Sequence, residues 1–438
     1  MNKILEETLA MNRKLSRFYP YGILALFAIL MLTVIRTSLF GAVEPEMHIY
    51  FEIVFLLLIA VLGEILVTYF KQPSVMVLML LGILISSSFF SLVWGVLLAL
   101  GINISAEPPQ ILRADQVISV FAQLGAIILL FKVGLHSKLE GIFALDNLLV
   151  AIAGVVVPFA AGYLYASYTG GNFAYSMFTA AALTATSVGV TVALLKEFNL
   201  VSQRFAQIIV GAAVIDDILG LLVLSLVINL TGGTVSIEPM IQTGLTAAVF
   251  ILGSVVAGRI FVDYLDREWP SGSGAIMLAL ALMLSYAYVA EFIRLSAIVG
   301  AFMAGIVLNR SRHLREIEDK TSGLELLFMP IFFISLGMMV DVTSLYAYAI
   351  PIVIITALAF ATKIIPCAFA ALVAGLKKKE ALAVGIGMSP RGEVALIVAS
   401  LGLTNGVLSV SEYSVISAMA LLSAFLMPPM LTRVLKGK

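Results

Sequence analysis

Apolar runs of about 20 residues follow one another through most of the chain, separated by short stretches with charges, glycines or prolines. A helix needs about 20 apolar residues to cross the hydrocarbon core of a bilayer, because each residue advances the helix by about 1.5 Å. Charged residues make up 12% of the 438 residues, roughly half of their share in soluble globular proteins. The sequence therefore predicts an all-α polytopic membrane protein, and no soluble domain is visible.

Charges, glycines, prolines and polar clusters divide the chain into about fourteen candidate transmembrane helices. These lie near residues 19–40, 50–70, 73–90, 115–133, 147–168, 173–196, 204–230, 238–263, 272–291, 293–309, 323–341, 345–374, 381–404 and 410–434. Residues 1–18 are polar and are expected to form an N-terminal segment ahead of a membrane domain over residues 19–435. Residues 91–114 form the longest external connection, and its apolar run around Trp94 is expected to form an interfacial segment rather than a fifteenth crossing.

Basic residues are concentrated in alternate loops, as expected because lysine and arginine accumulate in cytoplasmic connections. Loops of one parity hold nearly all of them, whereas the other loops hold only Arg113 and Arg294. This alternation fits an even number of crossings with the N and C termini both cytoplasmic. The chain has 26 basic and 26 acidic residues, so no net charge attracts nucleic acid, and no nucleic-acid partner is expected.

Cysteine and histidine give no sign of redox or metal chemistry. Cys367, the single cysteine, cannot form an internal disulfide and is expected to pack in an apolar helix. His48, His136 and His313 are scattered without paired spacing, which disfavours a transition-metal site. His136 is retained as a candidate pH sensor. No cofactor is expected.

Two adjacent aspartates, Asp216 and Asp217, lie in the middle of the apolar stretch 208–228. A charged side chain at the bilayer centre costs about 3 kcal/mol, so such acids usually face a cavity, a counter-charge or a transported ion. Adjacent helical residues are about 100° apart, so one aspartate can line a cavity while the other contacts a neighbouring helix. Lys363 lies deep in another span and is the expected partner of one aspartate; a static ion pair between two helices is the alternative.

Two predicted helices contain helix-breaking residues at mid-span. Residues 182–190 include Thr184, Thr186 and Ser187, and residues 385–393 include Pro390 between glycines. The two helices run in opposite directions through the membrane, as in inverted-repeat secondary transporters whose unwound backbone supplies ion ligands. The alternative is the ordinary tolerance of membrane helices for glycine and proline.

The remaining intramembrane charges include Arg391 and Glu393 beside the second break and Glu64 in the second span. Unwound helix ends need charge compensation, so we expect these three residues to form structural ion pairs rather than to bind transported ions. The carboxylates of Asp216 and Asp217, with hydroxyls and free carbonyls, are hard oxygen ligands that suit a monovalent cation of the size of sodium.

Four segments, 210–220, 183–189, 332–338 and 390–394, resemble the monovalent cation:proton antiporter superfamily, nearest the NapA and GerN type of sodium/proton antiporters. The resemblance covers residues 50–434 and implies two crossed discontinuous helices and a homodimer. It further implies an elevator-like core, near residues 147–230 and 345–434, that moves against a dimerisation scaffold near residues 19–133 and 238–341. In that family Asp217 would be the main cation and proton carrier, Asp216 would pair with Lys363, and Thr186 and Ser187 would lie near the ion.

The expected function is therefore secondary active antiport of protons against sodium, with lithium or potassium as other candidate cations, by a protein of the cell (inner) membrane. No enzymatic activity is expected. A sodium-coupled organic-solute symporter of related fold is the runner-up. A cation channel needs no inverted pair of broken helices, and the Gly-x-Gly-Asp pattern of an intramembrane aspartyl protease is absent.

Overall fold

All regular structure in the described part of the computed structural model is helical. The structure describes residues 45–70, 72–101, 108, 115–137, 144–231, 238–268, 273–293 and 295–436, together with the single positions 22, 26, 29, 30 and 33. The predicted N-terminal segment 1–18 lies outside the described residues, as does nearly all of the predicted helix 19–40. Both stay predictions.

The first half of the described chain contains α2 (Pro45–Phe70), α3 (Ser74–Leu84), α4 (Ser87–Ala99), α5 (Asp115–Leu135), α6 (Leu145–Tyr168), α7 (Phe173–Thr184), α8 (Val188–Glu197) and α9 (Arg204–Thr231). The second half contains α10 (Glu238–Glu268), α11 (Ser273–Phe292), α12 (Ala297–Leu308), α13 (Leu314–Met338), α14 (Val342–Ala347), α15 (Ala349–Val373), α16 (Lys378–Gly387), α17 (Glu393–Thr404) and α18 (Val410–Lys436). Among the described residues, nine helices are long and apolar enough to cross a membrane, and α3 with α4 adds a tenth candidate if the bent pair is one span. The total of fourteen crossings stays a prediction.

One helix is predicted near residues 73–90, whereas the structure has two helices there that meet at a bend of 49°. α3 ends at Leu84, and the hydroxyl of Ser86 caps α4 by accepting a hydrogen bond from the Phe89 N–H at 3.2 Å. The hydroxyl of Ser88 holds the bend in place, since it donates to the Val340 carbonyl at 2.9 Å and accepts from the Val342 N–H at 3.1 Å. α4 then continues to Ala99, well beyond the predicted end at residue 90.

Both helices predicted to contain mid-span breaks are interrupted. α7 ends at Thr184 and α8 begins at Val188, whereas α16 ends at Gly387 and α17 begins at Glu393. Pro390 removes a backbone donor from the second break. In the first break Ala185 is extended, with φ −57° and ψ 140°, and the helix restarts three residues later. Backbone carbonyls and amides that a continuous helix would pair are therefore available at two places inside the protein.

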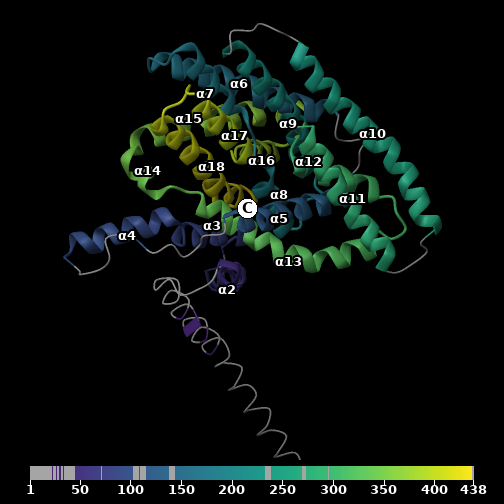
Figure 1. Cartoon of the computed structure of the whole chain (residues 1–438). Helices are drawn as coiled ribbons and strands as arrows, with labels where there is room; N and C mark the ends of the chain where they lie inside the picture. Colours follow the sequence, from purple (N-terminus) through teal and green to yellow (C-terminus); the bar gives the residue numbers. More distant parts are fainter. Residues whose placement is uncertain are drawn as a thin grey trace, which may run out of the picture.

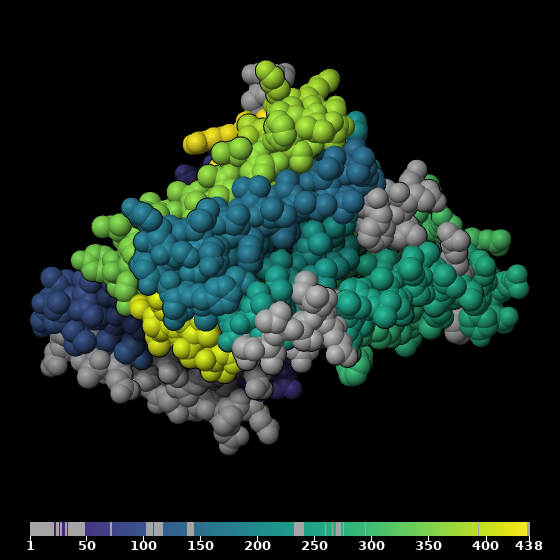
Figure 2. All heavy atoms as spheres, turned by 90° about the horizontal axis from the view of Figure 1, so that it is seen from above, coloured from purple at the N-terminus to yellow at the C-terminus, as the bar shows by residue number. Residues whose placement is uncertain are grey.

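Two groups of helices pack most closely among themselves. α5 packs against α12 and α13, and α13 also packs against α3. A second group consists of α6, α7, α9, α15, α16, α17 and α18, which Figure 1 shows together above α5 and α13. α6 and α15, distant in sequence, lie side by side at the outer face of this second group (Figure 2). α8 lies between the two groups, since it contacts α9 and α18 of the second group and α3 and α5 of the first.

Small residues allow the closest approach within the first group. A Cβ added to Gly337 of α13 would lie 2.0 Å from the carbonyl oxygen of Met79 in α3, and a Cβ on Gly82 would lie 2.1 Å from the carbonyl oxygen of Ile334. Backbone contact of this kind is a common way for membrane helices to associate, because lipid supplies no hydrophobic force between them. The packing of α3 on α13 therefore depends on glycine at both positions.

Replacing Gly337 by alanine should destabilise the protein by about 1–3 kcal/mol, because the methyl group meets backbone rather than a movable side chain. Gly323 lies on the same helix with nothing within 4 Å of an added Cβ, so Gly323→Ala is the matched control. Thermal unfolding of the detergent-solubilised chain measures the difference. Equal melting temperatures for the two variants would show that the α3–α13 contact does not limit stability.

Candidate functional site

The ammonium group of Lys363 lies at the centre of the second helix group, and its side chain is completely buried. Its Nζ donates to the Gly154 carbonyl at 2.6 Å, to the Thr184 carbonyl at 2.8 Å and to Oδ1 of Asp216 at 2.9 Å. A lysine ammonium has three donors, so all of them are used. The charge is compensated by one carboxylate and by two carbonyl dipoles, which is what a buried cation requires.

Both carbonyls that bind Lys363 are made available by local sequence. Pro158 lies inside α6 and has no N–H, so the carbonyl four residues earlier, at Gly154, lacks its intrahelical partner. Thr184 is the last residue of α7, and its carbonyl is left over because the helix stops there. Gly154 also gives Lys363 space, since a Cβ at residue 154 would lie 3.1 Å from the lysine Cε.

Asp216 is 1% exposed, and only one of its two carboxylate oxygens is bonded. Oδ1 receives the hydrogen bond from Lys363, whereas buried Oδ2 has no hydrogen-bond partner within the described residues. The buried hydroxyl of Thr186, in the α7–α8 break, also lacks a partner there. Buried polar atoms without partners are rare in folded proteins, so these two oxygens are candidate ligands for a water or an ion, and the carboxylate oxygen also for a proton. Oxygen ligands of this kind suit sodium better than a soft metal.

Asp217 follows Asp216 in α9 and is half-buried. α9 packs against both α7 and α8, and its middle lies beside the first break, because Asp216 and the Thr184 carbonyl bind the same Lys363 ammonium. The helix twist separates the directions of the two aspartates by about 100°, and Asp216 forms the ion pair with Lys363 at 2.9 Å. The assignment of Asp217 as the carrier is taken up below as a proposal.

Arg391 is also completely buried, and carbonyl oxygens surround its guanidinium group. Nε donates to Leu183 at 2.9 Å, Nη1 to Ser389 at 2.5 Å and Nη2 to Ala359 at 3.0 Å. Leu183 and Thr184 are the last residues of α7, so Arg391 and Lys363 together compensate the negative end of that half-helix. Arg391 thus links the first break, the second break and α15.

The two breaks touch each other. The Ser187 N–H in the first break donates to the Pro390 carbonyl in the second at 2.9 Å. The Thr191 hydroxyl in α8 donates to the carbonyl of Gly387, the last residue of α16, at 2.7 Å. A Cβ on Gly392 would lie 2.6 Å from the Ser187 Cβ, so glycine is required for this approach. The structure thus places Thr186 and Ser187 where both interrupted helices meet.

The other predicted site residues lie away from this centre or outside the described atoms. The side chain of Glu393 is not among the described residues, so its predicted ion pair stays a prediction. Glu64 is exposed on α2 and forms no ion pair with another described residue. Its predicted structural pairing stays a prediction. His136 lies at the end of α5, with Nε2 3.3 Å from a carboxylate oxygen of Glu318.

Two cavities lie at opposite ends of α5 and α13. The larger, about 760 Å³, is lined by residues including Ser119, Gln123, Glu291, Phe332 and Asp341. The ring of Phe332 separates it from α8, since a Cβ on Gly189 would lie 3.3 Å from the Phe332 Cζ. The smaller, about 240 Å³, is lined by residues including Lys132, His136, Lys196 and Glu318. We name these two regions the Asp341 end and the Lys196 end.

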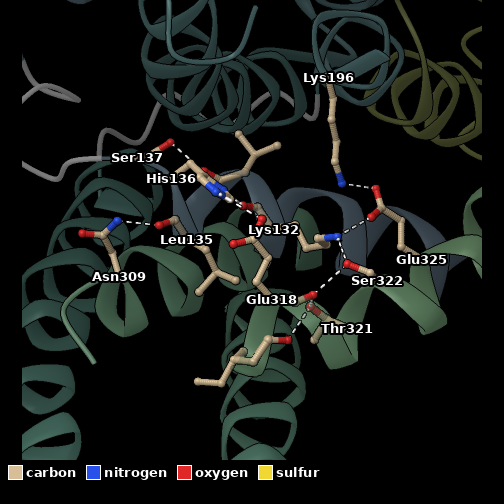
Figure 3. A network of polar contacts seen from close by, with 12 residues as sticks. Lys132, Leu135, His136, Ser137, Lys196, Asn309, Glu318, Thr321, Ser322 and Glu325 are labelled. Carbon is tan, nitrogen blue, oxygen red and sulfur yellow. Dashed lines mark hydrogen bonds and ion pairs between the residues drawn. The ribbon is translucent and has the colours of Figure 1, made fainter. Parts of the chain in front are cut away.

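Figure 3 shows an ion-pair network at the Lys196 end that the sequence did not predict. Glu325 of α13 binds both Lys132 of α5, at 2.7 Å, and Lys196 of α8. Lys132 and Lys196 are among the basic residues predicted to lie in or beside cytoplasmic loops, whereas Lys132 is only 6% exposed. Glu325 could have indicated the network, because an acid inside the predicted span 323–341 needs a basic partner. No partner was predicted for it.

Comparison with known proteins places this arrangement in a family. Residues 53–437 match the family model described as sodium/hydrogen exchanger, transmembrane. The chain is 35% identical over 357 residues to the high-affinity Na⁺/H⁺ antiporter NhaS3 of Synechocystis sp., covering 76% of each protein. It is 30% identical over 394 residues to the Na⁺/H⁺-K⁺ antiporter GerN of Bacillus cereus, covering 88% of this chain and 96% of GerN.

The fold agrees with a solved structure at lower sequence identity. The sodium proton antiporter MjNhaP1 from Methanocaldococcus jannaschii matches with a TM-score of 0.61 and 17% identity, covering 89% of this chain and 100% of that one. These relatives are named as transporters, not as enzymes. The chain is therefore an integral membrane protein of the transmembrane sodium/hydrogen exchanger family.

Proposed function

We propose that this protein exchanges protons for sodium ions across a membrane as a secondary active antiporter. The observation that carries the proposal is the buried centre where two interrupted helices meet, with Asp216 bound to Lys363 through one oxygen while its other oxygen and the Thr186 hydroxyl have no partner among the described residues. The names of NhaS3 and GerN support the same activity. No relative reported above is named as an organic-solute symporter, and that alternative is not favoured.

Exchange follows from competition for one carboxylate. A half-buried acid such as Asp217 is stabilised either by a proton, which removes its charge, or by a cation, which compensates it. Thr186, Ser187 and Asp216 supply further oxygens around this carboxylate in our proposal. A site carrying an uncompensated charge would be unfavourable in a low-dielectric barrier, so only the occupied site should move between the two faces.

The packing supports an elevator-type movement between two bodies. We assign a core near residues 147–230 and 345–434, which contains both breaks, and a scaffold near residues 19–133 and 238–341. The Lys363, Asp216 and Arg391 bonds all connect elements within the core, so the site would travel as a unit. The larger cavity at the Asp341 end reaches Phe332 beside α8, which supports access to the site from that end.

Several finer features complete the proposal. We propose about fourteen crossings with inverted repeats and crossed discontinuous helices, both termini cytoplasmic, and a homodimer formed through the scaffold in the cell membrane. Sodium is the proposed cation, and lithium and potassium share its ligand chemistry; GerN is named for both sodium and potassium. Proton flux in proteoliposomes, scanned over the three ions, decides the selectivity.

Asp217→Asn should abolish sodium-driven proton movement in proteoliposomes, because the amide cannot exchange a proton or balance a cation. The decrease should exceed about 100-fold, the usual lower range for loss of an essential proton-transfer group. Asp263 is exposed on α10, so Asp263→Asn is the control and should leave exchange unchanged. Persistent exchange in Asp217→Asn would refute the assigned carrier.

Lys363→Met should lower stability by about 3–5 kcal/mol, because it leaves the Asp216 carboxylate buried without its cation. The double variant Asp216→Asn with Lys363→Met should recover most of this loss, since no unpaired charge remains. Thermal unfolding of both variants in detergent gives the comparison. Additive losses in the double variant would contradict a coupled pair.

The dependence of the exchange rate on membrane potential tests whether Lys363 takes part in moving charge. If Lys363→Met leaves this dependence unchanged, Lys363 does not contribute to the charge-moving steps.

A further inference from the structure

We propose that the contact between Lys196 and Glu325 is an ionic latch that holds the Lys196 end of the transport path closed. This inference rests on the proposed function, because it assumes that the core and the scaffold move against each other during exchange. The latch joins α8, which carries the second half of the first broken helix, to α13 of the scaffold. Release of the latch would let the path open at the Lys196 end.

The network has one carboxylate between two ammonium groups (Figure 3). The Glu325 carboxylate binds the Lys132 Nζ through Oε2 at 2.7 Å and the Lys196 Nζ through Oε1. Lys132 also donates to the Ser322 hydroxyl at 2.7 Å. The Glu325 and Lys132 side chains are 11% and 6% exposed, whereas that of Lys196 is 32% exposed. The acid and Lys132 are therefore shielded from solvent, and Lys196 reaches them from the edge.

Lys196 is the member of this network that can leave without creating an unpaired buried charge. Lys132 and Glu325 belong to α5 and α13, which pack closely along their lengths within the scaffold. They form a neutral pair by themselves, so the carboxylate stays compensated after Lys196 moves away. Removal of Glu325 would instead leave two lysines facing each other, one of them buried. The arrangement thus suits a contact that forms and breaks while the scaffold pair persists.

A second contact fixes the same end of α8 to the scaffold. The carboxylate of Glu197, the residue after Lys196, accepts from the Ser74 N–H at 3.0 Å and from the Ser74 hydroxyl at 2.7 Å. Ser74 is the first residue of α3, where the helix N-terminus favours a negative charge. Two consecutive residues of α8 therefore bind two different scaffold helices.

The position of the latch matches the difference between the two cavities. Glu318 at the Lys196 end and Ser335 at the Asp341 end are separated by about 25 Å along α13, at about 1.5 Å per residue. The cavity beside the latch has a volume of about 240 Å³, compared with about 760 Å³ at the other end. The latch therefore lies beside the smaller cavity, and the larger cavity lies at the opposite end.

Cysteine labelling of the full-length chain in detergent tests the latch without requiring transport. Val133 is 2% exposed and lines the smaller cavity, and half-buried Ser335 lines the larger one, so Val133→Cys and Ser335→Cys report on the two ends. Native Cys367 is completely buried and gives little background. Each reporter is combined with Lys196→Gln and reacted with a hydrophilic maleimide.

Lys196→Gln should accelerate labelling at Val133→Cys by about fivefold and slow it at Ser335→Cys, because loss of a partly buried ion pair favours the opposite-facing state. Lys196→Arg should retain the labelling rates that each reporter variant shows with native Lys196. Arg204→Gln is the matched control, since Arg204 pairs with Asp146 at 2.8 Å between two core helices and spans no moving boundary. Lys196→Met keeps the unbranched stem and serves as the second variant if Lys196→Gln does not fold.

Unchanged labelling at both reporters in Lys196→Gln and Lys196→Met would overturn the latch. An equal acceleration by Arg204→Gln would also overturn it, because a general loosening would then explain the result. The proposed function is tested separately by proton flux in the unsubstituted protein. Absence of sodium-driven flux there would refute antiport whatever the labelling shows, whereas normal flux with unchanged labelling would refute only the latch.

Discussion

The ion pair of Lys363 with Asp216 is the interaction on which the centre of this protein depends. An ammonium and a carboxylate at this depth are tolerated only together, and the lysine needs two further acceptors to use all of its donors. The chain supplies them by stopping α7 at Thr184 and by placing Pro158 four residues after Gly154. The buried charges and the helix interruptions therefore depend on each other. The free carbonyls compensate the Lys363 ammonium, and the ammonium binds carbonyls that would otherwise lack a partner.

The breaks also account for how charges are distributed around the site. Arg391 and Lys363 compensate the carbonyl end of α7, and the Ser187 N–H and the Thr191 hydroxyl bind carbonyls of the second break. These bonds leave one oxygen of Asp216 and the hydroxyl of Thr186 without partners within the described part of the chain. A rigid frame around a few unused oxygens is what a site for an exchangeable proton or cation requires.

Features set by local sequence could be predicted, whereas features set by distant contacts could not. Thr186, Pro390 and the neighbouring glycines mark both breaks because they disfavour a continuous helix wherever they occur. A partner for a buried aspartate follows from the cost of an isolated charge, which makes Lys363 identifiable. The bend at Ser86 depends on the backbone at Val340 and Val342, and the Glu325 network joins three helices. No local pattern reveals such partners.

Proton release on sodium binding tests the central claim most directly. Sodium added to the detergent-solubilised protein in weakly buffered solution below neutral pH should release protons, because the two ions compete for one carboxylate. The apparent sodium affinity should fall as the pH is lowered. Saturable sodium binding that releases no protons, with an affinity independent of pH, would contradict a shared carrier.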